Sequence, residues 1–225
     1  MGHAVGGPRP TVDVTGGAYV RGMLLAQRCP VCGSAAHPTA RGGGCGVPCV
    51  QCLRTLSRAR DVAAPPGVDV CRCLLDYEGL ARHVVSGIKY RNDRRVLPWM
   101  AAEMAALLVP PQGCLVTWAP TTAAHRRSRG FDQAELLARA VARRWRVPCR
   151  RLLRRPPQPA QTGRSRTQRQ HGAVVLAARR GQRVIHPVII IDDVLTTGAT
   201  LNHAAQALRV AGAPWVGALT AARTP

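Results

Sequence analysis

The stretch VIIIDDVLTTGAT, residues 188 to 200, joins four branched apolar residues to two adjacent carboxylates and then to small hydroxylated residues around one glycine. A fully apolar run such as 188–191 is typical of a central parallel strand that is covered on both faces. Apolar residues then repeat at helical spacing over 201–208, which predicts a helix after the turn. The stretch therefore predicts the middle of an α/β sheet. Asp192 and Asp193 would lie at its carboxyl edge, where such folds bind ligands.

The rest of the chain continues this alternation of strands and helices. Strands are expected at 71–77, 115–118 and 216–220. Helices are expected where apolar residues recur every three or four positions, in the ranges 80–88, 97–108 and 134–145. A basic loop would follow the strand at 115–118, and residues 151–172, rich in Pro and Arg, predict a long mobile loop. The expected fold class is α/β, a parallel sheet flanked by helices.

Composition limits the possible partners and compartments. The formal charge of +21 favours phosphorylated or polyanionic partners. Lys89 is the only lysine, and such an arginine bias in a chain rich in Ala, Gly and Pro weakens the charge as a nucleic-acid signal. The chain has neither an 18-residue apolar run nor the order of a signal peptide, so we expect a cytoplasmic protein. We expect a disordered N-terminus at 1–24, a Cys-rich module at 25–60 and an α/β domain at 68–225.

The turn Thr196-Thr197-Gly198-Ala199-Thr200 has the residues of a phosphate-binding site. Backbone N–H groups at a helix N-terminus can face a phosphate, and the helix dipole favours its negative charge. Gly198 allows close approach of the backbone, and the threonine hydroxyls add donors. Asp192 and Asp193 can accept hydrogen bonds from sugar hydroxyls and hold a hydrated Mg²⁺. The stretch thus predicts a site for a sugar phosphate.

Two other interpretations of the paired acids are possible. One carboxylate could cap the turn while the other is solvated, but the coincidence of strand, acids and turn favours a ligand site. A strand ending in acids also resembles the second motif of P-loop ATPases. That interpretation fails because Lys89 lies in SGIKYR and the chain contains no G-x-x-x-x-G-K-[ST].

Three further segments match a known pattern together with VIIIDDVLTTGAT. They are IKYRNDRR at 88–95, RGFDQAELLARAVA at 129–142 and QTGRSRTQR at 161–169. VIIIDDVLTTGAT resembles the phosphoribosyl-pyrophosphate (PRPP) signature of type I phosphoribosyltransferases, and the four segments together resemble the ComF/GntX family. The resemblance covers roughly residues 29–222. It implies a type I phosphoribosyltransferase-like domain joined to a small N-terminal zinc module.

The resemblance also implies roles for individual residues. Asp192 and Asp193 would act as the catalytic acids, contacting the ribose hydroxyls and the Mg²⁺ shell. The 5′-phosphate would bind to Thr196, Thr197, Gly198, Ala199 and Thr200. The pyrophosphate would face Arg126, Arg127 and Arg129, for which a solvated basic loop is the alternative. The mobile loop that closes over PRPP would carry Gln161, Thr162, Arg166 and Arg169.

This chain departs from the family pattern at four places. It has Ala119-Pro120-Thr121 where the family usually has Val-Pro-Leu, and Asp132 where the family has Asn. It also has Arg164 for Leu and Gly172 for Asn. These positions lie in loops around the pyrophosphate, so they bear on turnover more than on PRPP binding.

The cysteines of the N-terminal part are spaced like metal ligands. Cys29 and Cys32 form one C-x2-C pair, and Cys49 and Cys52 form a second. Two such pairs in a segment without an apolar core indicate one tetrahedral Zn²⁺, with Cys45 or His37 as a replacement ligand and reduced thiols as the alternative. The remaining cysteines lie in strand patterns and are expected to be buried structural residues: Cys71, Cys73, Cys114 and Cys149.

Two functions follow from the resemblance. The first is a Mg²⁺-dependent transfer of phosphoribosyl from PRPP to an acceptor that the sequence does not identify, with zinc-module residues as candidates for the acceptor site. The second is a non-catalytic PRPP sensor that binds single-stranded DNA and acts with DNA-uptake proteins in competence. Only four Trp, three Tyr and one Phe are available for base stacking, which argues against a dedicated single-strand binder. A structural zinc protein with a dead site does not explain the turn at 196–200.

Overall fold

The protein is built around a parallel β-sheet, shown by a computed structural model that describes residues 28–35, 46–60, 62–156, 176–179, 181 and 183–225. Its four strands lie in the order β1-β6-β5-β2, and every neighbouring pair is parallel. Their bounds are β1 (Val70–Asp76), β2 (Leu115–Trp118), β5 (Val188–Leu195) and β6 (Val216–Arg223). The predicted parallel sheet is confirmed.

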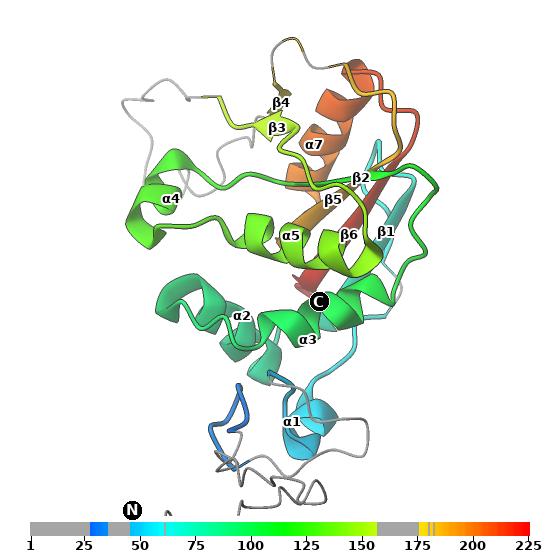
Figure 1. The fold of residues 1–225 in the computed structure, drawn as a ribbon. Coiled ribbons are helices and arrows are strands. Elements are labelled where there is room, and N and C mark those ends of the chain that lie inside the picture. Colours follow the sequence, from blue (N-terminus) through cyan, green and yellow to red (C-terminus); the bar gives the residue numbers. More distant parts are fainter. Residues whose placement is uncertain (1–27, 36–45, 61, 157–175, 180, 182) are drawn as a thin grey trace, which may run out of the picture.

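Helices cover both faces of this sheet (Figure 1). One face packs against α2 (Gly79–Arg91), α3 (Leu97–Ala105) and α5 (Gln133–Trp145), and the other against α7 (Ala199–Val210). Successive residues of a strand point to opposite faces. Ile189 and Ile191 therefore enter one core cluster while Val188 and Ile190 enter the other. This double covering explains why the run 188–191 contains no polar residue.

Two segments expected to be loops contain regular structure. The basic loop after β2 includes a short helix, α4 (Ala123–Arg129), which begins because the Thr122 side chain accepts a hydrogen bond from the His125 N–H at 3.1 Å. In the segment 151–172, β3 (Leu153–Arg154) pairs with β4 (Ala177–Ala178), because Leu152 and Leu153 are buried beneath α7. The mobile-loop prediction is therefore wrong for the start of that segment, and residues 157–175 lie outside the described part.

Strand β5 runs further than the sequence pattern indicated. It continues through Asp192 and Asp193 to Leu195, and Asp192 is still paired with Thr220 of β6. On its other side, β2 ends at Trp118, which lies opposite Ile191. The two acids thus project past the end of β2, so they are held by a strand and also face an open edge.

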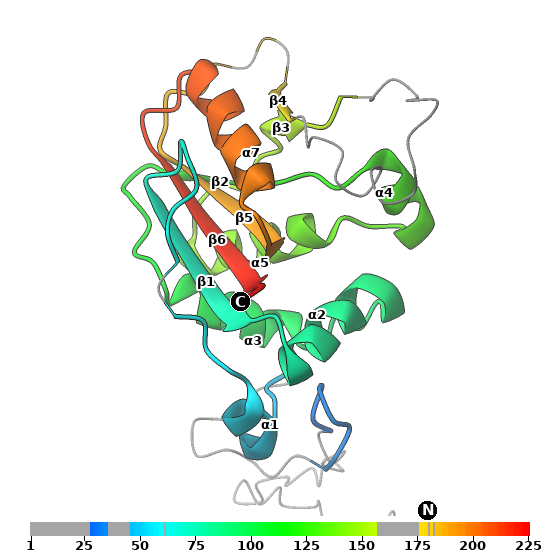
Figure 2. The same ribbon diagram turned by 180° about the vertical axis from the view of Figure 1, so that it is seen from behind.

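The cysteine-rich segment packs beneath α2 and α3 (Figures 1 and 2). It contains α1 (Val50–Thr55), and Val31, Val47 and Leu53 contact the core that those helices form. Gly46 lies so close to the carbonyl of Arg95 that a Cβ atom would overlap that oxygen. The segment is therefore fixed against the turn between α2 and α3, and the boundary between residues 60 and 68 stays a prediction. No helix in the described part has the length and apolarity to cross a membrane.

Candidate functional site

A cavity of about 320 Å³ lies at the carboxyl end of β5. Its walls come from the last turn of α2, the connection from β2 to α4, the start of α5 and the segment after β3. The lining consists of Lys89, Tyr90, Ala119, Pro120, Thr121, His125, Arg129, Asp132, Gln133, Ala134, Arg155, Asp192, Asp193, Val194 and Thr200. The cavity joins the predicted acids to one end of the predicted phosphate turn.

The two acids are held by a lysine from α2. Lys89 Nζ lies 3.1 Å from Asp193 Oδ2, and each of these side chains is less than one fifth exposed. Asp192 Oδ1 accepts the backbone N–H of Asp193 at 2.8 Å. Burial raises the pKa of Asp192 to about 8, the charge of Asp193 adds to this rise, and Lys89 partly opposes it. At pH 7 a large part of Asp192 is therefore protonated, which reduces the negative charge that lies beside Lys89.

Sequence reasoning did not assign Lys89 to the site. Two signals pointed to it: the segment IKYRNDRR belongs to the family pattern, and Lys89 is the single lysine in a chain that otherwise uses arginine. A compact ammonium on a flexible stem can approach one carboxylate oxygen as a point charge, which a planar guanidinium does less well. The ion pair with Asp193 therefore explains why a lysine occupies position 89 in a chain that otherwise uses arginine.

The turn at 196–200 starts α7, as expected. Gly198 is the N-cap residue with φ of +77°, and Thr197 Oγ1 accepts the N–H of Ala199 at 3.4 Å. Among the described residues, no backbone acceptor pairs with the N–H groups of Thr200 and Leu201. Such free N–H groups are what an anion at a helix N-terminus requires. Of the five predicted phosphate ligands, Thr200 lines the cavity.

Gly198 has a packing role in addition to its backbone conformation. A Cβ atom there would lie 3.0 Å from Cγ of Pro65, in the segment before β1. An L-residue would also be strained at this positive φ. A larger residue at Gly198 would consequently disturb the turn itself, so it is a poor test of phosphate binding.

The predicted arginines divide into two groups. Arg129 lines the cavity, whereas Arg126 and Arg127 are exposed and do not contribute to its lining. Arg155, which sequence reasoning missed, also lines it and donates from Nε to the carbonyl of Pro120 at 3.2 Å. Burial lowers the pKa of Arg155, while Asp192 and Asp132 raise it. The predicted mobile-loop residues lie outside the described part: Gln161, Thr162, Arg166 and Arg169.

Asp132 and Gln133, at the start of α5, line one side of the cavity. Asp132 is 5% exposed, and its Oδ2 accepts the backbone N–H of Thr121 at 2.9 Å. Burial raises the pKa of Asp132, and backbone N–H groups including that of Thr121 partly offset the rise. Gln133 donates from Nε2 to the carbonyl of Val85 at 3.3 Å, and its Oε1 has no partner among the described residues. These two hydrogen bonds thus connect the start of α5 to α2 and to the loop after β2.

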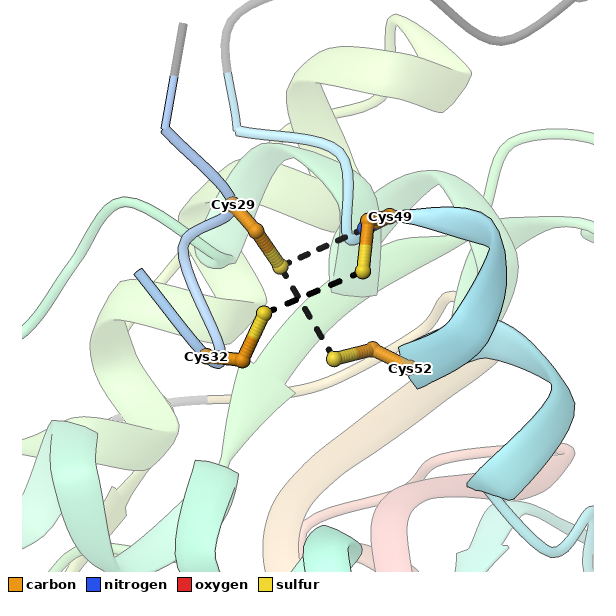
Figure 3. A group of neighbouring side chains, drawn as sticks. All are labelled: Cys29, Cys32, Cys49 and Cys52. Atoms are coloured by element: carbon orange, nitrogen blue, oxygen red, sulfur yellow. Dashed lines mark hydrogen bonds between the residues drawn. The ribbon is translucent and has the colours of Figure 1, made fainter. Parts of the chain in front are cut away.

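The four predicted metal ligands lie together, as Figure 3 shows. The sulfur atoms of Cys29, Cys32, Cys49 and Cys52 are all within 4.8 Å of one another. The pairs Cys29/Cys52 and Cys32/Cys49 are each 3.8 Å apart. Four ligands about 2.3 Å from a tetrahedral zinc would be about 3.8 Å apart. The cluster therefore has the donor set and the dimensions of a structural metal site, while Cys45 and His37 lie outside the described residues.

Polar groups favour the thiolate form at two of the four cysteines, Cys29 and Cys32, whereas burial and the neighbouring cysteines raise the pKa of the Cys52 thiol. Burial opposes ionisation of Cys29, but N–H groups of its neighbours outweigh this effect, so the pKa of its thiol is lowered. Two of these N–H groups, from Val31 and Cys49, point to its sulfur at 3.4 and 3.3 Å. The Ser34 hydroxyl and N–H lower the pKa of Cys32 to about 6. Thiolates are the form that binds a metal.

Comparisons with known proteins agree with these features. No protein-family model matches the chain. The chain is 26% identical to "Competence protein ComFC" of Bacillus subtilis over 188 residues, which are 82% of this chain and 72% of that protein. It is 32% identical to "Competence protein F" of Haemophilus influenzae over 89 residues, covering 37% of this chain and 39% of that one.

Two solved structures show distant similarity. Glutamine PRPP amidotransferase from Bacillus subtilis aligns with a TM-score of 0.38 at 22% identity, over 55% of this chain and 26% of that one. Hypoxanthine phosphoribosyl transferase of Trypanosoma cruzi aligns with a TM-score of 0.32 at 17% identity, over 60% and 64% of the two chains.

The parallel sheet, the acid pair followed by a helix N-terminus, and the separate four-cysteine cluster define an α/β domain with a candidate ligand site and an N-terminal module with a candidate metal site. The sequence similarity to the competence proteins and the four-cysteine cluster fit the ComF family.

The buried acid pair predicts a pH effect on stability. Because the pKa of Asp192 is higher in the folded chain than in the unfolded chain, the folded state binds more protons between pH 4 and pH 8. Asp192 therefore lowers the free energy of unfolding as pH rises through that window. Asp192→Asn should stabilise the protein at pH 8, by at most about 5 kcal/mol if the whole shift of the pKa from about 4 to about 8 is counted, and leave it nearly unchanged near pH 4. Urea unfolding of both proteins at several pH values measures the difference, and a pH-independent difference would contradict the assignment.

Proposed function

We propose that the cavity binds PRPP with Mg²⁺ and that the protein transfers its phosphoribosyl group to an acceptor. The observation that carries this proposal is the placement of two acids and the start of a helix on one strand, so that both face the same cavity. Cations from three different segments complete the lining: Lys89, Arg129 and Arg155. No single surface loop would bring these groups together.

Charge in the cavity supports an anionic ligand. Three permanent cations line it, and the pKa values of Asp192 and Asp132 are both raised by burial. Because the pKa of Asp192 is about 8, its carboxyl is largely protonated at pH 7, so three cations face at most two other carboxylates of the lining. A ligand with phosphate and pyrophosphate groups would balance this excess, and electrostatic stabilisation of leaving charge is a large term in catalysis.

Different residues of the cavity bind different groups of the ligand. Free N–H groups at the start of α7 and the Thr200 hydroxyl bind the 5′-phosphate, and the carboxylates of Asp192 and Asp193 accept the ribose hydroxyls. Arg129 and Arg155 bind the pyrophosphate. Asp192 and Asp193 would hold the Mg²⁺ that accompanies PRPP, and its charge would offset the repulsion between the carboxylates and the pyrophosphate. In the transfer, the bond from the ribose C1 to pyrophosphate breaks with its electron pair on the leaving group, and a bond from the acceptor to C1 forms.

We propose zinc as the metal of the four-cysteine cluster. Four thiolates in tetrahedral contact select soft metals, and zinc is the usual ion in structural sites with C-x2-C pairs. The support is the 3.8 Å separation of two sulfur pairs and the N–H groups directed at Cys29.

A second candidate function is that of a PRPP sensor that also binds single-stranded DNA. This second function is favoured by a cluster of exposed arginines at the end of α5 and in the segment before β3. The cluster comprises Arg143, Arg144, Arg146, Arg150 and Arg151, and no salt bridge within the described part of the chain engages them. Similarity to proteins named for competence is consistent with a role in DNA uptake.

Substitutions at the two halves of the cavity should affect ligand binding differently. Replacing both acids, Asp192→Asn with Asp193→Asn, removes charged acceptors and should weaken PRPP binding about 100-fold and abolish its Mg²⁺ dependence. Thr200→Val removes a phosphate donor and should weaken binding of PRPP and of ribose 5-phosphate about tenfold each. Isothermal titration with and without Mg²⁺ measures both effects.

The matched control for Thr200→Val is Thr55→Val, a threonine of α1 that is exposed and remote from the cavity. It should leave both affinities unchanged. If Thr200→Val kept the wild-type affinity for both ligands, the phosphate would bind elsewhere and the proposed function would fall. Release of pyrophosphate on addition of acceptor bases separates the transferase from the sensor.

One zinc ion per chain is expected by elemental analysis of the purified protein. Cys49→Ser should lose this ion and raise amide hydrogen exchange in segments 28–35 and 46–56, because the segment depends on the metal for its order. The main unfolding transition of the α/β domain should remain. Cys149→Ser, at a half-buried cysteine outside the cluster, is the control and should retain the zinc. Metal-free protein with both segments protected from exchange would refute the proposal.

If the arginine cluster binds single-stranded DNA, affinity should depend steeply on salt. Each phosphate contact contributes a slope of about −0.7 to a plot of log K against log salt. Replacing Arg143 and Arg144 by Gln should therefore reduce the slope by about 1.4. Arg28→Gln with Arg60→Gln, two exposed arginines outside the cluster, should have little effect. Binding that hardly responds to salt would exclude a phosphate-contacting surface.

A further inference from the structure

A second hollow lies where the cysteine-rich segment meets α2. It has a volume of about 270 Å³ and is lined by residues 30–33, by one side of α2 and by the turn at 93–96; we call it the module hollow. Segment 28–35, drawn in blue, lies beneath α2 in both views (Figures 1 and 2). The module hollow shares no lining residue with the cavity at the end of β5. It is therefore a separate place for a ligand.

The two hollows use different sides of α2. His83, Gly87 and Arg91 line the module hollow, and their spacing of four residues places them in one row along the helix. Lys89, which pairs with Asp193, follows Gly87 by two residues and lines the other cavity. Two residues correspond to a rotation of about 200° around a helix axis. The row on α2 is therefore free of the proposed transfer site.

The guanidinium of Arg91 is seated on the helix at Gly87. Gly87 is buried in the middle of α2 with a helical backbone, so no turn requires a glycine there. Glycine also favours a helix less than alanine does. A Cβ atom at this position would lie 3.1 Å from Nη2 of Arg91, and the three atoms nearest to it all belong to that guanidinium. The glycine thus makes room for a cation at the wall of the module hollow.

Arg91 keeps its positive charge without an acidic partner. No carboxylate in the described part of the chain forms a salt bridge with it. Its Nη2 donates instead to Nε2 of His83 at 3.0 Å, since a guanidinium can only donate. Asp93, the acid in the lining, is held by Arg95, whose Nε and Nη2 donate to its two oxygens at 2.9 and 2.7 Å. The charge of Arg91 is thus available to a ligand.

The turn after α2 holds Arg95 at the same hollow. Asn92 has φ of +52°, a left-handed conformation that ends the helix and turns the chain. The N–H groups of Asn92 and Asp93 both donate to the carbonyl of Gly87. On the other side, Gly46 of the cysteine-rich segment packs on the carbonyl of Arg95. The backbone that carries Arg95 is therefore fixed from two sides.

We propose that the module hollow binds a small phosphate monoester, such as a nucleotide or a sugar phosphate. Guanidinium groups present paired N–H donors that match phosphate oxygens, and Arg95 has N–H groups left over from its contact with Asp93. A phosphate monoester carries about 1.5 to 2 negative charges at pH 7, which Arg91 and Arg95 would meet. Val31, half-buried in the lining, would contact the rest of the ligand. The volume lies near the lower end of small-molecule sites and favours a compact ligand.

The test uses adenosine 5′-monophosphate (AMP) as the probe, titrated calorimetrically into the full chain. Arg91→Gln should weaken AMP binding about tenfold, because a charge-assisted hydrogen bond is lost. Gly87→Ala should weaken it as well, because the methyl group displaces the guanidinium, although alanine favours the helix. Arg82→Gln is the matched control, at an exposed arginine of α2 that lines neither hollow, and should bind AMP like the wild type.

Two measurements separate the module hollow from the cavity at β5. Thr200→Val should leave the Arg91-dependent binding of AMP unchanged, and AMP should reduce amide hydrogen exchange in segments 28–35 and 83–96. Wild-type protein that does not bind AMP would overturn the proposal. Binding that Thr200→Val removes and Arg91→Gln does not would also overturn it. Failure of PRPP to bind the wild type would instead refute the proposed function and leave this site standing.

Two further controls define the ligand and the role of Arg91. Displacement of AMP by a 5′-phosphorylated oligothymidylate, and not by the same oligomer without its phosphate, would show that the monoester can belong to a nucleic acid end. Displacement by ribose 5-phosphate alone would identify small sugar phosphates, and either result supports the site. Elemental analysis of Arg91→Gln should give the wild-type metal content. Loss of the metal would assign Arg91 to the cysteine cluster and overturn the proposal.

Discussion

Two adjacent carboxylates at the end of a central strand are the constraint on which the site depends. Alone, the buried charges of Asp192 and Asp193 would oppose folding, because burial disfavours ionised carboxylates. The ammonium of Lys89, 3.1 Å from Asp193, compensates one of these charges. The other charge is reduced by the raised pKa of Asp192. The acids can therefore stay at a ligand-facing edge only if α2 holds Lys89 beside them.

The position of α2 in turn depends on two other parts of the chain. Val84, Val85 and Ile88 pack in the core shared with α3 and α5, and Gln133 donates to the carbonyl of Val85. On the opposite side, the cysteine-rich segment contacts the turn after α2, where Gly46 meets the carbonyl of Arg95. A metal bound by the four cysteines would stiffen that contact. The metal module thus supports the wall of the cavity through α2, although none of its described residues lines the cavity.

The sequence predicted the parts that depend on periodicity and on local motifs. The apolar run at 188–191, the helix after it and the two C-x2-C pairs each specify their own geometry, and the structure contains all three. Lys89, Arg155 and Asp132 were not predicted as site residues, because they meet the acids only through the packing of α2, β3 and α5. The helix α4 was missed because its cap, Thr122, precedes a segment with no buried residue. No apolar period existed to reveal it.

The net charge of the chain does not decide between the two candidate functions. Arginine replaces lysine almost everywhere in this chain. The formal net charge of +21 therefore reflects a general preference for arginine as well as any charge needed for binding. The charge that matters is local, where Lys89, Arg129 and Arg155 surround acids whose pKa values are raised. That arrangement supports the proposal of a compact phosphorylated ligand in this cavity. The surface proposed for contact with a nucleic acid is the group of exposed arginines near α5, which lie outside the cavity lining. The proposed binding of a small phosphate ligand and the proposed binding of DNA would use different surfaces, so a variant of one surface should leave the other unchanged.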